Sequence, residues 1–306
     1  MASLKELRAR INSVKSTKKI TSAMKMVAAA KMHRAERRSR QAQPYAQAML
    51  KILVNLKKSL GERPGLPELL VGNGKQDTHL IIPVSSDRGL AGGFNGNINR
   101  ATRVLVERLL QQGKKVKICP IGFKSYVYFR GEFPELVTGP KGSDHRLGNV
   151  TFETAEQIAL YIEALLRDQG FDECTVIYNR FKNVMLQVPT ELKLIPLQLE
   201  VEENKVETLD EKLAVNKPPP SEAQYSFEPD GEEVMRRLLP QNLRVQLFAA
   251  MLETNAGEQG ARMAAMDSAT RNAAKAIDKL SLYYNRTRQA NITNELTEVI
   301  SGANAA

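Results

Sequence analysis

The stretch LKELRARINSVKSTKKITSAMKMVA, residues 4–28, decides the fold of this 306-residue chain. Leu4, Leu7, Ile11 and Val14 recur at alternating steps of three and four residues, the spacing of an apolar helix face that packs on a second helix. After a changed step, which is typical of a coiled-coil discontinuity, the stripe is predicted to continue at Thr17, Ile20, Met24, Val27 and Ala28. The segment therefore predicts one long helix that needs a partner helix.

The same end of the chain carries all of its net charge. Residues 1–40 hold 12 Lys or Arg and two acids, and the whole chain holds 44 and 34, so 32 basic and 32 acidic residues remain for positions 41–306. A basic helical arm on a neutral body indicates an acidic partner. Nucleic acid, a lipid surface and an acidic protein loop all fit that description.

The apolar pattern resumes at residues 46–56, and the first stop signal is Gly61, although Pro44 is predicted to end or kink the helix. If the helix runs through, its 57 residues span about 85 Å. A second long helix is predicted from Gln241 to about Ile300, a range without proline. Small residues at three- and four-residue steps would let the two helices approach closely; they are Ala264, Ala265, Ala269, Ala273 and Ala276.

These features predict an antiparallel coiled coil of the N- and C-terminal helices, with two unconnected helices in separate bundles as the alternative. Between them the pattern is α/β. Strands are expected at 78–84, 115–119 and 174–178, helices at 97–111 and 151–168, and an extended stretch interrupted by Pro189 and Pro196 at 184–199. Strand and helix alternate, so the central domain is predicted to be Rossmann-like with a parallel sheet. The expected domains are a coiled-coil helix at 1–60, the α/β domain at 75–200, an exposed linker and strand at 201–229 and a second coiled-coil helix at 230–306.

No enzyme site emerges from the residues. The Gly-rich turn at 85–95 follows the first strand, where an α/β fold would bind phosphate, but it lacks the Lys-Ser or Lys-Thr and the Gly spacing of a nucleotide loop. We expect this turn to seat a helix against the sheet. His33, His79 and His145 lie in different elements, so no metal site, cofactor or catalytic residue is predicted.

The sequence fits several other classes of protein less well. Cys119 and Cys174 each lie in an apolar run, which indicates reduced core thiols, and no stretch approaches the roughly 20 apolar residues of a membrane span. The basic N-terminus could be a transit peptide, but its regular apolar spacing favours the mature fold. A nucleic-acid-binding arm would lack aromatic residues for base stacking, and a stand-alone α/β enzyme would lack site residues.

Four stretches resemble the gamma subunit of the F-type ATP synthase. They are ITSAMKMVAAAK at 20–31, SDRGLAGG at 86–93, RMAAMDSATRNA at 262–273 and YNRTRQANITNEL at 284–296. The resemblance covers essentially the full length, and its first and last stretches are the most specific. It implies a central shaft, one copy per complex, inside a ring of three alpha and three beta subunits, with the α/β domain near epsilon and the membrane c-ring. The chain would couple proton transport to ATP synthesis without being catalytic or binding nucleic acid.

The resemblance also implies which residues touch partners. It implies that the acidic lever loop of beta contacts Met24, Lys25, Arg34 and Arg37. It implies that beta and alpha contact the upper shaft at Arg286, Arg288, Gln289, Thr293 and Glu295. It also implies that the two shaft helices pair through Glu258, Arg262 and Met266. The regulatory cysteine pair of chloroplast-type relatives is missing, and the helix starts at once. We therefore expect a peripheral membrane protein on the cytoplasmic face of a bacterial inner membrane, with a mature organellar chain as the alternative.

Overall fold

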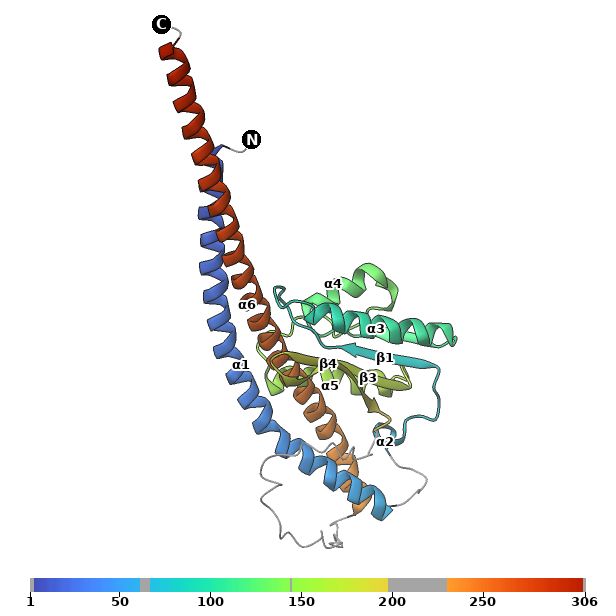
Figure 1. The fold of residues 1–306 in the computed structure, drawn as a ribbon. Coiled ribbons are helices and arrows are strands. Elements are labelled where there is room, and N and C mark those ends of the chain that lie inside the picture. Colours follow the sequence, from blue (N-terminus) through green and yellow to red (C-terminus); the bar gives the residue numbers. More distant parts are fainter. Residues whose placement is uncertain (1–2, 61–66, 144, 198–229, 305–306) are drawn as a thin grey trace, which may run out of the picture.

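A long two-helix shaft with an α/β domain on one side forms the molecule (Figure 1). The structure, a computed structural model, describes residues 3–60, 67–143, 145–197 and 230–304. The shaft helices are α1 (Leu4–Leu60) and α6 (Gly231–Asn304). The predicted linker at 201–229 lies outside the described residues.

Both shaft helices are continuous through their prolines. The 57 residues of α1 include Pro44 and the 74 residues of α6 include Pro240, so neither proline ends its helix. At 1.5 Å per residue, α6 spans about 110 Å. At the start of α1, Ser3 and Glu6 form a capping box, in which the Glu6 N–H donates to Ser3 Oγ over 3.2 Å and the Ser3 N–H donates to Glu6 Oε2 over 3.0 Å.

The buried face of α1 differs from the predicted stripe. Ile20 and Val27 are 59% and 56% exposed, while Thr21 is buried. The buried residues all fall on one seven-residue register, although several of its positions, such as Val14 and Lys18, are half-buried or exposed: Leu7, Ile11, Thr21, Ala28, Met32, Ala35, Met49, Leu53 and Leu56. The predicted discontinuity between Val14 and Ile20 is therefore wrong. The apolar pattern predicted the wrong face because the polar Thr21 lies in the seam, the face of α1 that contacts α6, while the apolar Ile20 and Val27 face outward.

A four-stranded sheet in the order β2-β1-β3-β4 forms the centre of the α/β domain. Its strands are β1 (Thr78–Pro83), β2 (Lys115–Ile118), β3 (Glu173–Asn183) and β4 (Leu186–Ile195). β1 pairs in parallel with β2 and β3, which confirms the parallel sheet predicted from these three strands. The stretch predicted only as extended forms β4, which pairs antiparallel with β3. Pro189 does not interrupt β4, because a residue without an N–H is tolerated on an edge strand.

The remaining elements are α2 (Glu68–Val71), α3 (Phe94–Gln111), α4 (Phe123–Glu132), the 3-10 turn η1 (Pro134–Leu136) and α5 (Phe152–Arg167). The predicted helices match α3 and α5, although α3 starts three residues earlier than expected, and β3 runs five residues further than expected. Neither α2 nor α4 was predicted. The sequence of α4, FKSYVYFRGE, has almost no apolar side at helical period, so it gave no signal.

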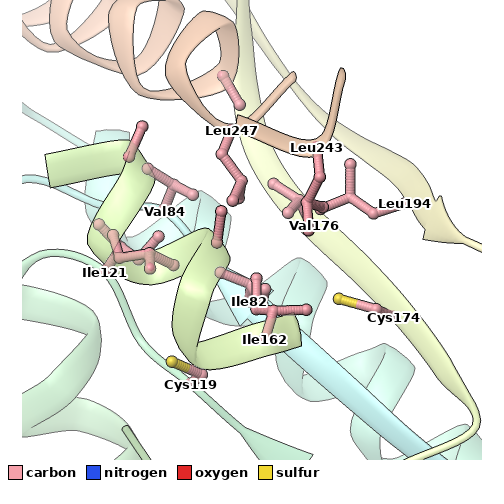
Figure 2. Close-up of a cluster of buried hydrophobic side chains, with 14 of the residues drawn as sticks. Ile82, Val84, Cys119, Ile121, Ile162, Cys174, Val176, Leu194, Leu243 and Leu247 are labelled. Carbon is pink, nitrogen blue, oxygen red and sulfur yellow. The ribbon is translucent and has the colours of Figure 1, made fainter. Parts of the chain in front are cut away.

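Different helices cover the two faces of the sheet. On one face, Ile82 of β1 and Val176 of β3 pack in one buried cluster with Ile162 of α5 and with Leu243 and Leu247 of α6 (Figure 2). On the other face, α3 contributes Ile98, Leu105, Val106 and Leu109 to a second cluster with β1, β2 and β3. The shaft helix α6 thus supplies part of the core of the α/β domain, which rigidly joins the shaft to the sheet.

Cys119 and Cys174 are buried free thiols, as predicted. Figure 2 shows both in the cluster beneath α5. Burial raises the pKa of the Cys119 thiol to about 12 and raises that of Cys174 well above its usual value. Both therefore stay protonated and serve as small apolar side chains.

The buried His79 makes the stability of the α/β domain depend on pH. Its Nδ1 lies 3.4 Å from Oε2 of Glu173, which also pairs with Lys193 at 3.0 Å, and its Nε2 lies 3.4 Å from Nζ of Lys114. Burial is the largest influence and lowers the pKa of His79 below its ordinary 6.5, although Glu173 opposes the shift. The unfolded chain therefore takes up a proton that the folded chain resists.

We expect the free energy of unfolding of the full chain to decrease as the pH falls below about 6.5, and His79→Gln to make that decrease smaller. Urea titrations at pH 7.5 and 5.5 measure the effect. His33→Gln is the matched control, because the His33 side chain is 74% exposed. An identical pH dependence in the His79→Gln protein and the parent would contradict the assignment.

Candidate functional site: the shaft, its junction with the sheet, and its tip

The turn after β1 is held in place by its own polar side chains. The Asp87 carboxylate accepts three backbone N–H groups, from Phe123 at 3.0 Å and from Leu147 and Gly148 at 2.8 Å. Asn95 at the start of α3 accepts the N–H of Ser86 at 3.0 Å. These bonds support the expectation that the turn seats a helix against the sheet, and they tie it to α4 as well.

Arg262 joins α6 to this same turn. Its guanidinium lies 2.5 Å from Glu258 Oε1 and donates to the backbone oxygen of Gly89 over 3.1 Å. Gln259 Oε1 accepts a further bond at 3.3 Å. The described bonds of Glu258 and Arg262 therefore run within α6 and to the α/β domain, whereas the resemblance implied pairing with the N-terminal helix. Met266, one turn further on, is 5% exposed.

The polar contacts between the shaft helices lie just above this junction. Lys25 Nζ is 2.6 Å from Asp267 Oδ1, and Thr270 Oγ1 donates to Thr21 Oγ1 over 2.8 Å. The hydrogen bond from Lys25 is the largest influence on Asp267 and lowers the pKa of that carboxyl. Sequence reasoning missed Asp267, Thr21 and Thr270 as pairing residues. A strict heptad assignment of α1 that allowed polar residues at the positions facing α6 would have identified Thr21.

The structure places the remaining residues predicted for the lower shaft on its outer surface. Arg34 and Arg37 are exposed, Met24 is half-buried, and the basic stretch continues to Arg40, which pairs with Glu36 at 2.7 Å. Arginines that point into solvent gain little from neighbouring charges of their own chain. They are available to an acidic partner.

The tip of the shaft is a single helix. Because Lys25 lies level with Asp267 and both helices rise 1.5 Å per residue in opposite directions, Leu4 lies level with about residue 288. Figure 1 shows α6 running past the start of α1. All five predicted upper-shaft residues are exposed, namely Arg286, Arg288, Gln289, Thr293 and Glu295.

Large apolar side chains are also exposed at the tip. They are Ile292, Leu296, Val299 and Ile300, with exposed fractions of 52–69%. Contiguous apolar surface of this kind marks a site of interaction with another protein. No side chain of the described residues covers it.

The described residues contain no group of three or more His, Cys, Asp or Glu placed to hold a metal ion. None of the described helices is both long and apolar enough to pass through a bilayer. The features available for binding a partner are a basic face on the lower shaft and an exposed single-helix tip. Polar contacts join the two shaft helices between them. These surfaces define the class of protein as an assembly subunit built around a coiled coil.

Comparisons with known proteins agree with that class. The family model described as ATP synthase matches residues 3–306. The ATP synthase gamma chain of Gluconacetobacter diazotrophicus is 54% identical, and that of Rhodospirillum rubrum 47%, each with 100% of both chains covered. A central-stalk chain of the Tetrahymena thermophila mitochondrial ATP synthase is 27% identical, with 82% of this chain and 99% of that chain covered and a TM-score of 0.56.

A chain from the mitochondrial ATP synthase of Euglena gracilis has the same fold at 17% identity, with a TM-score of 0.62 and 99% and 94% of the two chains covered. The protein described here belongs to the ATP synthase gamma chain family. It is a rotor shaft subunit of the ATP synthase and is not itself catalytic.

Proposed function

We propose that the shaft turns inside a ring of three alpha and three beta subunits, one copy per complex, with the α/β domain next to epsilon and the membrane c-ring. The complex would lie on the cytoplasmic face of a bacterial inner membrane, and nucleic acid would not be a partner. The bare tip of α6, where apolar and charged side chains are exposed together, is the observation that carries the proposal.

The mechanism follows from a difference in symmetry. A ring of three equivalent catalytic subunits surrounds a shaft made of two unlike helices, so the shaft cannot offer the same contacts to all three. Each orientation of the shaft then favours the open or the closed form of each catalytic subunit by its differential affinity for the two forms. Because such coupling is reciprocal, nucleotide binding in the ring also drives the shaft. Proton flow can thereby drive ATP release, and ATP hydrolysis can drive proton pumping.

The contact residues divide between the two ends of the shaft. Near the tip, Arg288 and Gln289 are exposed and carry hydrogen-bond donors, and Arg286, Thr293 and Glu295 are exposed on the same segment of α6. On the lower shaft, Arg34 and Arg37 form a basic surface suited to an acidic loop of beta, with Met24 at its edge. Attraction between exposed charges is screened within about 10 Å at ordinary salt and is weakly directional, which suits a surface that must slide.

We expect Arg288→Ala/Gln289→Ala to lower proton pumping per ATP hydrolysed in the assembled complex, while assembly and the fold of the shaft are kept. Inverted membrane vesicles with a pH-sensitive dye measure the pumping. Arg236→Ala is the matched control, because Arg236 is an exposed arginine of α6 at the opposite end of the shaft. Pumping at the parental ratio in the double variant would remove these two residues from the contact surface.

The partners themselves are tested by gentle purification of the tagged chain from its native membranes. Recovery of alpha and beta subunits in threefold excess, with ATPase activity that the isolated chain lacks, is the expected result. A preparation that contains nucleic acid and lacks those subunits would overturn the proposal.

A further inference from the structure

The loop between α2 and β1 places the groups needed to close a ring at one asparagine. Asn73–Gly74 is one of two Asn-Gly pairs in the chain, and Asn95–Gly96 is the other. We propose that Asn73 is a site of spontaneous deamidation, at which the side-chain amide is converted into a carboxylate or into an isoaspartate linkage. The proposal concerns the α/β domain alone and does not rest on the proposed function.

The reaction is an attack by the backbone nitrogen of Gly74 on Cγ of Asn73. The nitrogen loses its proton to hydroxide, the bond between this nitrogen and Cγ forms, and the bond between Cγ and Nδ2 breaks. The departing nitrogen takes a proton from water and leaves as ammonia, which completes a succinimide ring. Water then opens the ring at the side-chain carbonyl to give aspartate, or at the main-chain carbonyl to give isoaspartate. The net change is one water consumed and one ammonia released, so no oxidant or other reagent is needed.

Two hydrogen bonds direct polar groups at the atoms of Asn73 that gain charge in this reaction. The Lys75 N–H donates to Asn73 Oδ1 over 3.0 Å, so a donor already faces the oxygen on which negative charge develops. Asn73 Nδ2 donates to Oδ1 of Asp172 over 2.6 Å, so a carboxylate faces the nitrogen that becomes positive as it leaves. Both contacts strengthen as charge develops, and they therefore stabilise the transition state more than the starting amide.

The attacking nitrogen of Gly74 is free to move. None of the hydrogen bonds described for this loop uses the Gly74 N–H, and residues 74–77 are exposed. Nothing lies within 4 Å of the position that a Cβ would take at Gly74, and a residue without a side chain turns readily toward its neighbour. Asn73 itself lies outside the helices and strands, so ring closure breaks no regular backbone hydrogen bonding.

The second Asn-Gly pair lacks these conditions. Asn95 and Gly96 lie in the first turn of α3, and ring closure there requires the backbone to leave its helical conformation. Asn95 Nδ2 donates to neutral acceptors, the hydroxyl of Ser86 at 2.9 Å and the backbone oxygen of Arg88 at 3.3 Å, so no carboxylate faces the nitrogen that would leave. The chain thus contains a matched control for Asn73.

The reaction would weaken the attachment of the loop at the amino end of β1. Asp172 is 6% exposed, and its Oδ2 accepts the N–H groups of Asp77 and Thr78 at 2.9 and 2.8 Å. A carboxylate at position 73 would face the other oxygen of Asp172 in place of a donor, and two carboxylates that share one site repel each other. The loop therefore loosens as the protein ages, and with it the connection to α2, which packs against the shaft through Leu70.

Peptide mapping of the full chain by mass spectrometry, sampled during incubation at neutral pH, measures deamidation at each pair as a gain in mass of about 1 Da. We expect the two pairs to react at similar rates in guanidinium chloride, where neither is folded. In the folded chain we expect Asn73 to react roughly ten-fold faster than Asn95. Equal rates at the two pairs in the folded chain would overturn the proposal, because the hydrogen bonds of Asn73 would then protect its amide as the helix protects that of Asn95.

The structural consequence is tested with Asn73→Asp, which carries the product side chain. We expect it to lower the protection of the Asp77 and Thr78 amides from hydrogen exchange by roughly ten-fold, the effect of losing one hydrogen bond to a charged group. The swap Asn73→Asp/Asp172→Asn is expected to restore protection, because an amide at position 172 accepts the same two N–H groups and donates to the new carboxylate. Gln76→Glu adds the same charge at an exposed position of the loop and is the matched control. Protection that is unchanged in Asn73→Asp, or that the swap fails to restore, would overturn this consequence.

Discussion

Gly122→Ala is expected to unfold the α/β domain while the shaft helices remain largely helical. Gly122 precedes α4 with φ at +98°, which L side chains rarely adopt, and a Cβ at this position would lie 2.2 Å from the backbone oxygen of Ser85. That oxygen cannot move away, because Ser85 is fully buried, its N–H donates to Ile121, and its hydroxyl accepts the Ser125 N–H. We expect a loss of more than about 4 kcal/mol, a large part of the stability of an ordinary domain.

Amide hydrogen exchange in β1 and β3 measures this loss, because the chain has no tryptophan and its circular dichroism is dominated by the shaft. Gly131→Ala is the matched control within the next helix, where nothing lies within 4 Å of the new methyl group. It is expected to be neutral or to stabilise by about 0.5–1 kcal/mol. Protection in the Gly122→Ala protein equal to that of the control would refute the close approach of these two backbone segments.

The second large effect is expected from Arg262→Leu, at the junction of shaft and sheet. The side chains of Arg262 and Glu258 are only 12% and 10% exposed, so leucine would leave a carboxylate buried without its cation and would also abandon the Gly89 carbonyl. Breaking a buried pair from one side costs about 3–5 kcal/mol. Urea unfolding followed by tyrosine fluorescence, with hydrogen exchange in the middle of α6, measures the effect.

Two further variants separate burial from charge pairing as such. Arg236→Leu breaks a pair of the same spacing on the same helix, but the Arg236 and Glu232 side chains are 61% and 42% exposed, so less than about 1 kcal/mol is expected. Glu258→Met/Arg262→Leu removes both buried charges and is expected to recover most of the stability lost in Arg262→Leu. If the double variant is as unstable as the single one, the carboxylate is not the cause.

The residues proposed for partner contact stay predictions, but the structure shows what surrounds each of them. The upper-shaft group from Arg286 to Glu295 is exposed, as a contact surface requires, and its members beyond about residue 288 lie on the single-helix tip. Lys25, expected to face a partner, is bound to Asp267 of α6 while its side chain stays 45% exposed, and Arg262, expected to pair the shaft helices, binds a turn of the α/β domain. In both cases the sequence indicated a residue that makes a specific polar contact. The residue that it contacts within the chain lies far away in sequence and could not be predicted from a local pattern.

By itself the sequence determined the two long helices, their antiparallel pairing and the α/β character of the middle, because helical periodicity and strand alternation are local patterns. It also indicated a shaft, through the charge of residues 1–40 and the four family-like stretches. The tertiary structure decided which face of α1 meets α6, that α6 helps to cover the sheet, and that β4 turns back as an antiparallel edge. These choices depend on contacts between distant segments, such as Lys25–Asp267, which a local apolar pattern does not encode.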